Sequence, residues 1–168
     1  LPLATAPGEY GLQVEIDGQR QAKRFTVHSK KHVEQRLKVS PKTVDLSPED
    51  NARYEREAAH QKTVMATFSE PPAGSSLQMR VPVPGRRSSS FGLRRIFNGQ
   101  PRNPHSGMDI AAPTGTPVRA PLPGKVIDVG DYFFNGGTVW LDHGAVLLSM
   151  YCHLSQVNCK LGDLLQTG

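Results

Sequence analysis

Apolar and polar residues alternate in the first forty positions, which is the period of a half-buried β-strand. Asp17-Gly18 interrupts the alternation and is a strong two-residue hairpin turn. A further short strand pattern covers residues 37–39. We therefore predict a partial N-terminal β domain over residues 1–40, built on a hairpin. The alternating apolar positions are Leu12, Val14, Ile16, Phe25 and Val27.

The period changes at residues 47–50, which have the composition of a helix start. A serine cap precedes a proline in the first turn, and two acidic residues lie at the positive end of the helix dipole. The pattern predicts a helix over residues 48–68, ended by Pro71-Pro72. We predict that residues 41–74 form a helical connector between two domains. One apolar stripe is available for packing: Tyr54, Ala58, Met65 and Phe68.

From residue 75 onward, short apolar runs are separated by turns rich in Gly and Pro. Short strands at this spacing are typical of an antiparallel sandwich or barrel. The chain is therefore predicted to be mainly β, with an antiparallel β-sandwich or barrel-like domain over residues 75–168. The candidate strands are 77–83, 117–120, 125–129, 138–142 and 147–153.

Composition narrows the class of protein. The 168 residues suffice for one or two domains, and 16 Gly and 14 Pro favour turns and short strands over a helix bundle. A net charge of +5 fits an anionic partner, but a nucleic-acid role would rest on charge alone, without a motif. Two cysteines exclude a disulfide-dense scaffold and a cysteine-based zinc knuckle.

His105 and Asp109 are separated by three residues and form the first candidate site. An imidazole and a carboxylate at this spacing can bind one divalent cation, and both are suitable ligands for Zn²⁺. A loop histidine beside a turn-forming aspartate accounts for the same spacing. A loop precedes His105 and an apolar run, 110–112, follows Asp109, which places the pair at the mouth of a sheet.

His153 closes the predicted strand 147–153 and is the second candidate. Strand parity places Ser149, Tyr151 and His153 on one, polar face, as in a catalytic groove. Leu148, Met150 and Cys152 then form the opposite, apolar face. This parity argues against a nucleophile pair of Cys152 and His153, since such a pair needs hydrogen-bond reach. A strand-end histidine bonded to a loop is the alternative, and His143 is expected to make a local hydrogen bond.

Several motifs resemble, in order, those of the lysostaphin-type zinc peptidases. The resemblance extends over about residues 77–168. The upstream β segment and helix are also similar to the N-terminal part of some Gram-negative wall hydrolases. The matching segments are 91–95 (FGLRR), 105–118 (HSGMDIAAPTGTPV), 120–121 (AP), 123–126 (PGKV), 141–144 (LDHG) and 150–155 (MYCHLS).

This resemblance implies a zinc-dependent endopeptidase that hydrolyses the peptide crosslinks of bacterial peptidoglycan, in the periplasm or elsewhere in the cell envelope. His105 and Asp109 would be zinc ligands, and His153 would be the catalytic histidine. The implied mechanism is metal-assisted hydrolysis, in which Zn²⁺ acidifies a water molecule and polarises the peptide carbonyl. A D-Ala–diaminopimelate crosslink is the expected target, with a glycine bridge as the alternative.

The chain departs from the family pattern at one point. The family takes its third zinc ligand and a further histidine from an H-x-H pair that follows a Gly-Asp-x-x-x-x-Gly turn. Residues 162–168 (GDLLQTG) supply that turn, but no H-x-H pair occurs in the sequence. We therefore expect the peptidase domain to be truncated at its C-terminal side, so that this chain alone lacks part of the active site.

Two other functions compete with the peptidase. The first is a catalytically inactive wall-binding or hydrolase-activating domain of the same fold. The second is a biotinyl- or lipoyl-like carrier, because residues 120–126 (APLPGKV) followed by Gly162-Asp163 also occur in such small sandwiches. A carrier needs a modifiable lysine at a hairpin tip, whereas Lys125 lies on a predicted strand.

Overall fold

The computed structural model describes residues 2–3, 5–40, 45–71 and 77–168. The fold is mainly β with antiparallel sheets, as the sequence predicts. Contacts divide the chain into two compact units, one of Leu1–Val39 with Arg87–Asp109 and the other of Ser40–Arg86 with Ile110–Gly168. The division into domains at 1–40, 41–74 and 75–168 stays a prediction.

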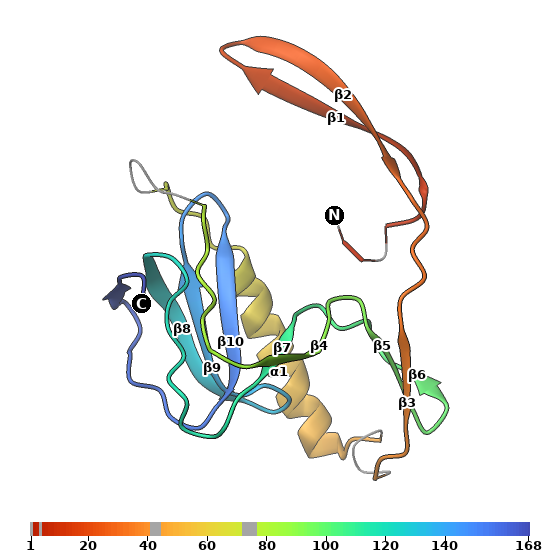
Figure 1. Ribbon diagram of the computed structural model, residues 1–168, viewed down its shortest axis with the longest axis vertical. Helices are drawn as coiled ribbons and strands as arrows, with labels where there is room; N and C mark the ends of the chain where they lie inside the picture. The colour runs from red at the N-terminus through yellow and green to blue at the C-terminus, as the bar shows by residue number, and fades with distance from the viewer. Residues whose placement is uncertain (1, 4, 41–44, 72–76) are drawn as a thin grey trace. The chain divides into compact units, whose positions relative to one another are not determined.

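The predicted N-terminal hairpin is present in the first unit as a long two-stranded ribbon (Figure 1). Strands β1 (Gly8–Ile16) and β2 (Gln19–Val27) pair antiparallel along nine residues each. Asp17 and Gly18 have φ of +50° and +74°, the left-handed pair that a tight hairpin turn requires. Two adjacent residues therefore determine the register of the whole ribbon.

The same unit contains a three-stranded sheet that the sequence does not predict in this form. Strand β3 (Glu34–Leu37) pairs parallel with β5 (Arg94–Phe97), and β5 pairs antiparallel with β6 (Gln100–Pro101). The predicted strand at 37–39 is thus shifted, and its partner is a short charged strand without apolar alternation. Strands β4 (Arg86–Ser89) and β7 (Asp109–Ala111) form a separate two-stranded sheet.

The second unit is built on a four-stranded antiparallel sheet in the order β10-β9-β8-β11. Three of its strands match predicted ones and extend beyond them. Val126, Val139 and Leu141 are buried at one face and form the core, against which Tyr151, Leu154 and Cys159 pack. The strands are β8 (Gly124–Tyr132), β9 (Gly136–Asp142), β10 (Leu148–Leu154) and β11 (Leu164–Leu165).

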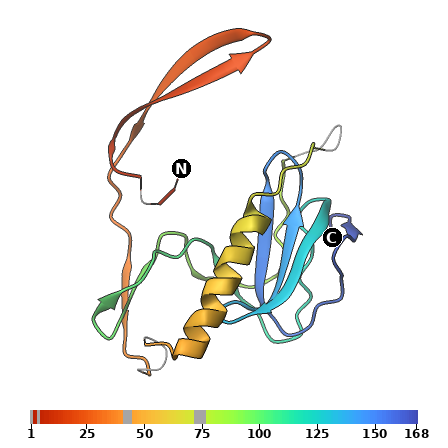
Figure 2. The same cartoon turned by 180° about the vertical axis from the view of Figure 1, so that it is seen from behind.

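Helix α1 (Pro48–Met65) begins where the sequence predicts and lies along the sheet in Figures 1 and 2. The Ser47 hydroxyl accepts a 3.1 Å hydrogen bond from the Asp50 amide, which satisfies one of the unpaired N–H groups of the first turn. The helix ends three residues before the predicted Phe68. No helix in the described residues is long and apolar enough to cross a membrane.

The apolar stripe predicted to pack is instead largely exposed, with Tyr54, Met65 and Phe68 at 41%, 50% and 64%. The apolar Val64 is the buried residue of the helix, at 7% exposure. Polar side chains also connect the helix to β8: the Arg53 guanidinium donates to the Asp131 carbonyl at 3.0 Å, and His60 Nε2 lies 2.8 Å from the buried Asp128 carboxylate. Polar contacts thus add to the packing of the helix on the sheet.

The predicted strands at 77–83 and 117–120 are wrong, because neither segment is a regular strand. The two segments do run close together, and the amides of Arg80 and Arg119 donate to the carbonyls of Pro121 and Pro82 at 3.0 and 2.8 Å. Four prolines in and beside these segments have no N–H group to donate, so a continuous ladder does not form. They are Pro82, Pro84, Pro117 and Pro121.

Candidate functional site

The structure brings the side chains of His105 and Asp109 together. His105 lies in the loop after β6, and Asp109 is the first residue of β7. Two backbone hydrogen bonds fix the loop, from the His105 amide to the Leu93 carbonyl at 2.9 Å and from the Gly92 amide to the His105 carbonyl at 2.8 Å. His105 Nε2 lies 3.2 Å from Asp109 Oδ1, so the two groups converge as the spacing predicts.

The second ring nitrogen of His105 is occupied. Its Nδ1 lies 3.2 Å from the Ser90 carbonyl oxygen and 3.2 Å from Ser89 Oγ. A carbonyl oxygen only accepts, so Nδ1 carries a proton, and Nε2, which faces Asp109, is the ring nitrogen that could ligate a metal. Metal-binding histidines are usually held in this way, with one nitrogen donating to the protein and the other free to ligate.

The donor pair fits a zinc ion. Zinc–nitrogen and zinc–oxygen bonds of roughly 2.0–2.2 Å in a tetrahedron separate two ligand atoms by about 3.3–3.5 Å. The observed separation of 3.2 Å between Nε2 and Oδ1 is close to that value. Within the described residues, however, no group of three or more His, Cys, Asp or Glu side chains could hold a metal. The pair therefore makes two parts of a site that normally needs three protein ligands.

Arg95 is part of this cluster, although the sequence does not single it out. Its Nη2 donates to Asp109 Oδ2 at 3.1 Å and to Ser89 Oγ at 3.3 Å. Successive side chains of a strand point to opposite faces, so Arg94 and Arg95 differ in what they reach. The motif FGLRR contains no signal that distinguishes the two arginines.

His153 lies at a β-bulge near the end of β10, where pairing with β9 shifts register between Tyr151 and Leu154. Its φ is +58°, in the left-handed region that non-glycine residues seldom adopt. The His153 amide donates to the Asn135 carbonyl at 2.7 Å, and the residue is exposed. Bulges redirect side chains and are common beside active sites, so this conformation suits a reactive histidine.

Ser149 and Tyr151 share a face of β10 as predicted, but the predicted polarity of the two faces is wrong. Tyr151, expected on a polar groove, packs against the hydrophobic core, and Met150, expected in the apolar layer, is 39% exposed. Strand parity fails beyond Tyr151 because the bulge removes the strict alternation on which it depends. His153 therefore does not share a regular strand face with Ser149 and Tyr151.

Ser149 and Tyr151 belong to a buried hydrogen-bond chain instead. The Pro123 carbonyl accepts from His143 Nδ1 at 2.8 Å, and His143 Nε2 accepts from Ser149 Oγ at 2.7 Å. The Tyr151 hydroxyl then donates to Ser149 at 3.1 Å. Burial raises the pKa of Tyr151, although the Ser149 contact acts in the opposite direction. His143 is hydrogen-bonded as expected, with one side-chain partner six positions away and the other twenty.

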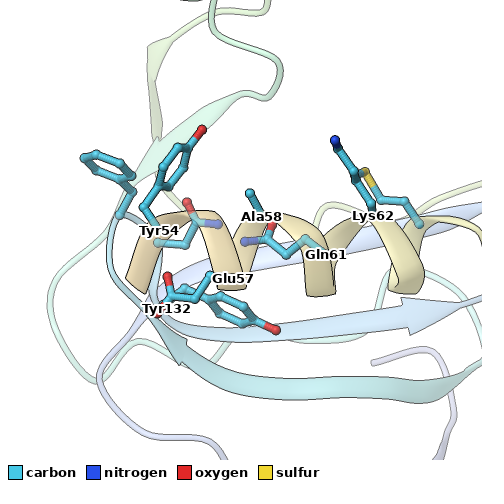
Figure 3. Close-up of a pocket in the computed structure, with 9 residues that line it drawn as sticks. Tyr54, Glu57, Ala58, Gln61, Lys62 and Tyr132 are labelled. Atoms are coloured by element: carbon cyan, nitrogen blue, oxygen red, sulfur yellow. The ribbon is translucent and has the colours of Figure 1, made fainter. Parts of the chain in front are cut away.

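Helix α1 supports the turn that holds His153. Glu57 Oε2 accepts from the Phe133 amide at 2.7 Å, and the Tyr54 and Phe134 rings meet edge to face at 5.3 Å. Figure 3 shows Tyr54, Glu57 and Tyr132 around the pocket at this junction, which has a volume of about 290 Å³. The same turn contains Asn135, whose carbonyl binds the His153 amide. Sequence pattern alone does not reveal these supporting contacts.

The cysteines have the character of packing residues. Cys159 lies against the hydrophobic core. Burial raises the pKa of its thiol most, and the nearby Asp163 carboxylate raises it further. A raised pKa lowers the thiolate fraction at neutral pH, which is the opposite of what a cysteine nucleophile requires. Cys152 is half-buried beside the bulge.

Comparison with known proteins supports the family resemblance. Residues 103–168 match the model of peptidase family M23. The chain is 37% identical over 101 residues to the peptidoglycan DD-endopeptidase ShyA of Vibrio cholerae. The aligned region covers 56% of this chain and 24% of ShyA. It is 35% identical over 66 residues to lysostaphin of Staphylococcus simulans, covering 38% of this chain and 13% of lysostaphin.

A crystal structure assigned to peptidase M23 from Pseudomonas aeruginosa has the same fold. It superposes with a TM-score of 0.76 at 42% identity, over 100% of this chain and 61% of that one. The mainly β fold and the ordered motifs thus resemble those of lysostaphin-type peptidases. Residues 103–168 match peptidase family M23, which confirms the resemblance found in the sequence.

Proposed function

We propose that this chain is part of a zinc-dependent endopeptidase that cleaves peptide crosslinks of bacterial peptidoglycan in the cell envelope. The observation that carries the proposal is the convergence of His105 Nε2 and Asp109 Oδ1 at 3.2 Å within the M23 segment. The overlap of 101 residues with a peptidoglycan DD-endopeptidase favours a D-Ala–diaminopimelate crosslink. Because the chain spans 24% of that relative, the activity is proposed for the natural full-length protein.

Each candidate residue has a separate role in this proposal. His105 and Asp109 would supply two of the zinc ligands. The bound ion would acidify a water molecule and polarise the scissile carbonyl. His153 exchanges a proton at its imidazole with the attacking water and then with the leaving amine. Ser90 keeps the His105 proton on Nδ1, so that Nε2 stays available.

The carrier alternative is less well supported. Lys125 lies inside β8, opposite Asp142 on one side and Leu164 on the other. A lysine that a ligase modifies lies at an exposed hairpin tip. Lys125 instead lies in a strand that is paired on both sides, so its position does not match that of a carrier lysine. The inactive alternative differs from the proposal only in zinc binding and turnover, which are directly measurable.

Zinc content tests the proposed metal site. The natural full-length protein is expected to contain about one zinc per chain, and His105→Ala or Asp109→Ala should reduce this strongly, since each removes one of three protein ligands. His28→Ala, an exposed histidine in the N-terminal unit, is the matched control. Elemental analysis after gel filtration gives the stoichiometry. Equal zinc in all four proteins would overturn the assignment of these ligands.

Removal of the thiols separates a metallopeptidase from a cysteine enzyme. The double variant Cys152→Ala, Cys159→Ala should keep hydrolysis of purified crosslinked muropeptides within a few-fold of the wild type. A chelator should abolish activity in both proteins, and added zinc should restore it. Loss of turnover in a folded double variant, with resistance to the chelator, would instead indicate thiol chemistry. A pentaglycine peptide, assayed in parallel, reports on the alternative bond specificity.

A further inference from the structure

We propose that Arg95 is a positioning residue that holds Asp109 as a one-oxygen metal ligand and ties its orientation to that of His105. This inference rests on the proposed function, because it concerns the same metal site. Arg95 does not touch the substrate or the metal in this proposal. It acts on the carboxylate that would bind the metal.

The two oxygens of the Asp109 carboxylate have different partners. Oδ2 accepts a 3.1 Å hydrogen bond from Arg95 Nη2, whereas Oδ1 faces His105 Nε2 at 3.2 Å. Charge-assisted hydrogen bonds between arginine and carboxylate are among the stronger side-chain contacts. With Oδ2 engaged in this way, only Oδ1 is presented toward the imidazole nitrogen.

Ser89 connects the same arginine to the other ligand. Its Oγ accepts from Arg95 Nη2 at 3.3 Å and lies 3.2 Å from His105 Nδ1. Arg95, Ser89, His105 and Asp109 therefore form a closed ring of contacts, in which each side chain meets two others. A ring of this kind restricts the rotation of the carboxylate and the imidazole together, which is how supporting residues preorganise metal ligands.

Two effects of Arg95 on metal affinity oppose each other. Its positive charge repels a divalent cation, while its hydrogen bonds orient the ligand. The side chains of Arg95 and Asp109 are 35% and 41% exposed, so water screens the charge effect. Orientation does not depend on screening, and loss of outer partners of metal ligands typically costs about 10–100-fold in affinity. We therefore expect orientation to dominate.

Zinc affinity in the natural full-length protein tests this directly. Metal-free protein is titrated with zinc against a competing chelator of known affinity. Arg95→Met removes the charge and the donors, and Arg95→Lys keeps the charge but loses the planar fork. Both should weaken zinc binding by roughly 10-fold or more. Arg94→Met removes the same charge one residue away and should stay within about twofold of the wild type.

Cobalt substitution gives a signature that a general loss of stability would not produce. In the wild type, Asp109 should bind Co²⁺ through one oxygen in a four-coordinate site, which absorbs strongly in the visible range. Release of Oδ2 in Arg95→Met lets the carboxylate bind through both oxygens and raises the coordination number. The visible absorption per bound cobalt should therefore fall in Arg95→Met but not in Arg94→Met.

The results that would overturn the inference are separate from those that would overturn the metal site. Zinc binding by Arg95→Met at wild-type strength or tighter would show that Arg95 does not position Asp109. Wild-type zinc affinity in Arg95→Lys would show that the planar guanidinium is not what holds Asp109. If the His105→Ala variant binds zinc as tightly as the wild type, the proposed metal site itself is wrong.

Discussion

Replacing His153 with alanine in the natural full-length protein is expected to lower kcat by roughly 10²–10⁴-fold, the usual contribution of a general acid–base group. Zinc content should stay near that of the wild type, because the assigned role of His153 is in proton transfer rather than ligation. Turnover of crosslinked muropeptides and elemental zinc are measured on the same preparation. Zinc loss from a folded variant would make His153 a ligand, and full activity would exclude both roles.

The backbone of His153 supplies a control for this experiment. With φ at +58°, the residue occupies a region that glycine adopts without steric cost, whereas alanine does not. His153→Gly and His153→Ala both lack the imidazole, but the glycine variant should be at least as stable as the alanine variant. Equal loss of turnover in the two variants assigns the effect to the missing side chain. Recovery of turnover in His153→Gly would assign it to distortion of the bulge.

Features determined by adjacent residues could be predicted from the sequence. The Asp17-Gly18 turn places two residues in the left-handed region, and this local geometry sets the β1–β2 register. Ser47 and the residues that follow it contain the complete signal for the start of α1. The convergence of His105 and Asp109 is also local, since only three residues separate them.

Features determined by distant contacts could not be predicted in this way. The β10 bulge lies where Leu154 pairs with Gly137, and a side chain at Gly137 would collide with the Leu154 carbonyl. Glycine at that position permits the close approach, but its partner is seventeen positions away in the sequence. Strand parity contains no information about such a partner, so it does not predict the orientation of His153 beyond the bulge.

The metal-site cluster has the same limitation. Arg95 meets Asp109 and Ser89 because β4, β5 and β7 bring three short segments to one place. None of these strands has four alternating apolar residues, so periodicity does not detect them. The motif resemblance locates the candidate ligands His105 and Asp109 without any strand prediction, whereas the contacts of Arg95 appear only in the folded chain.

Stability and catalysis should respond to different residues, and Leu141 provides the second large effect. Leu141 is 2% exposed in β9 and contacts the core with Val126 and Val139. Leu141→Ala removes buried methyl groups and leaves a cavity, which typically costs about 2–5 kcal/mol of the free energy of unfolding. The exposed Leu12→Ala in β1 is the control and should change it by no more than about 0.5 kcal/mol.

Urea unfolding followed by intrinsic fluorescence measures this difference, because Trp140 lies in the same strand as Leu141. The midpoint should fall in Leu141→Ala while the slope stays unchanged, as expected when only stability is altered.

Under conditions where the variant is folded, its kcat should remain near that of the wild type, since Leu141 faces the core and lies outside the reacting groups. His153→Ala should give the reverse pattern, with normal stability and low turnover. A stability loss below about 1 kcal/mol in Leu141→Ala would show that the β8–β9–β10 sheet is not the cooperative core of this unit.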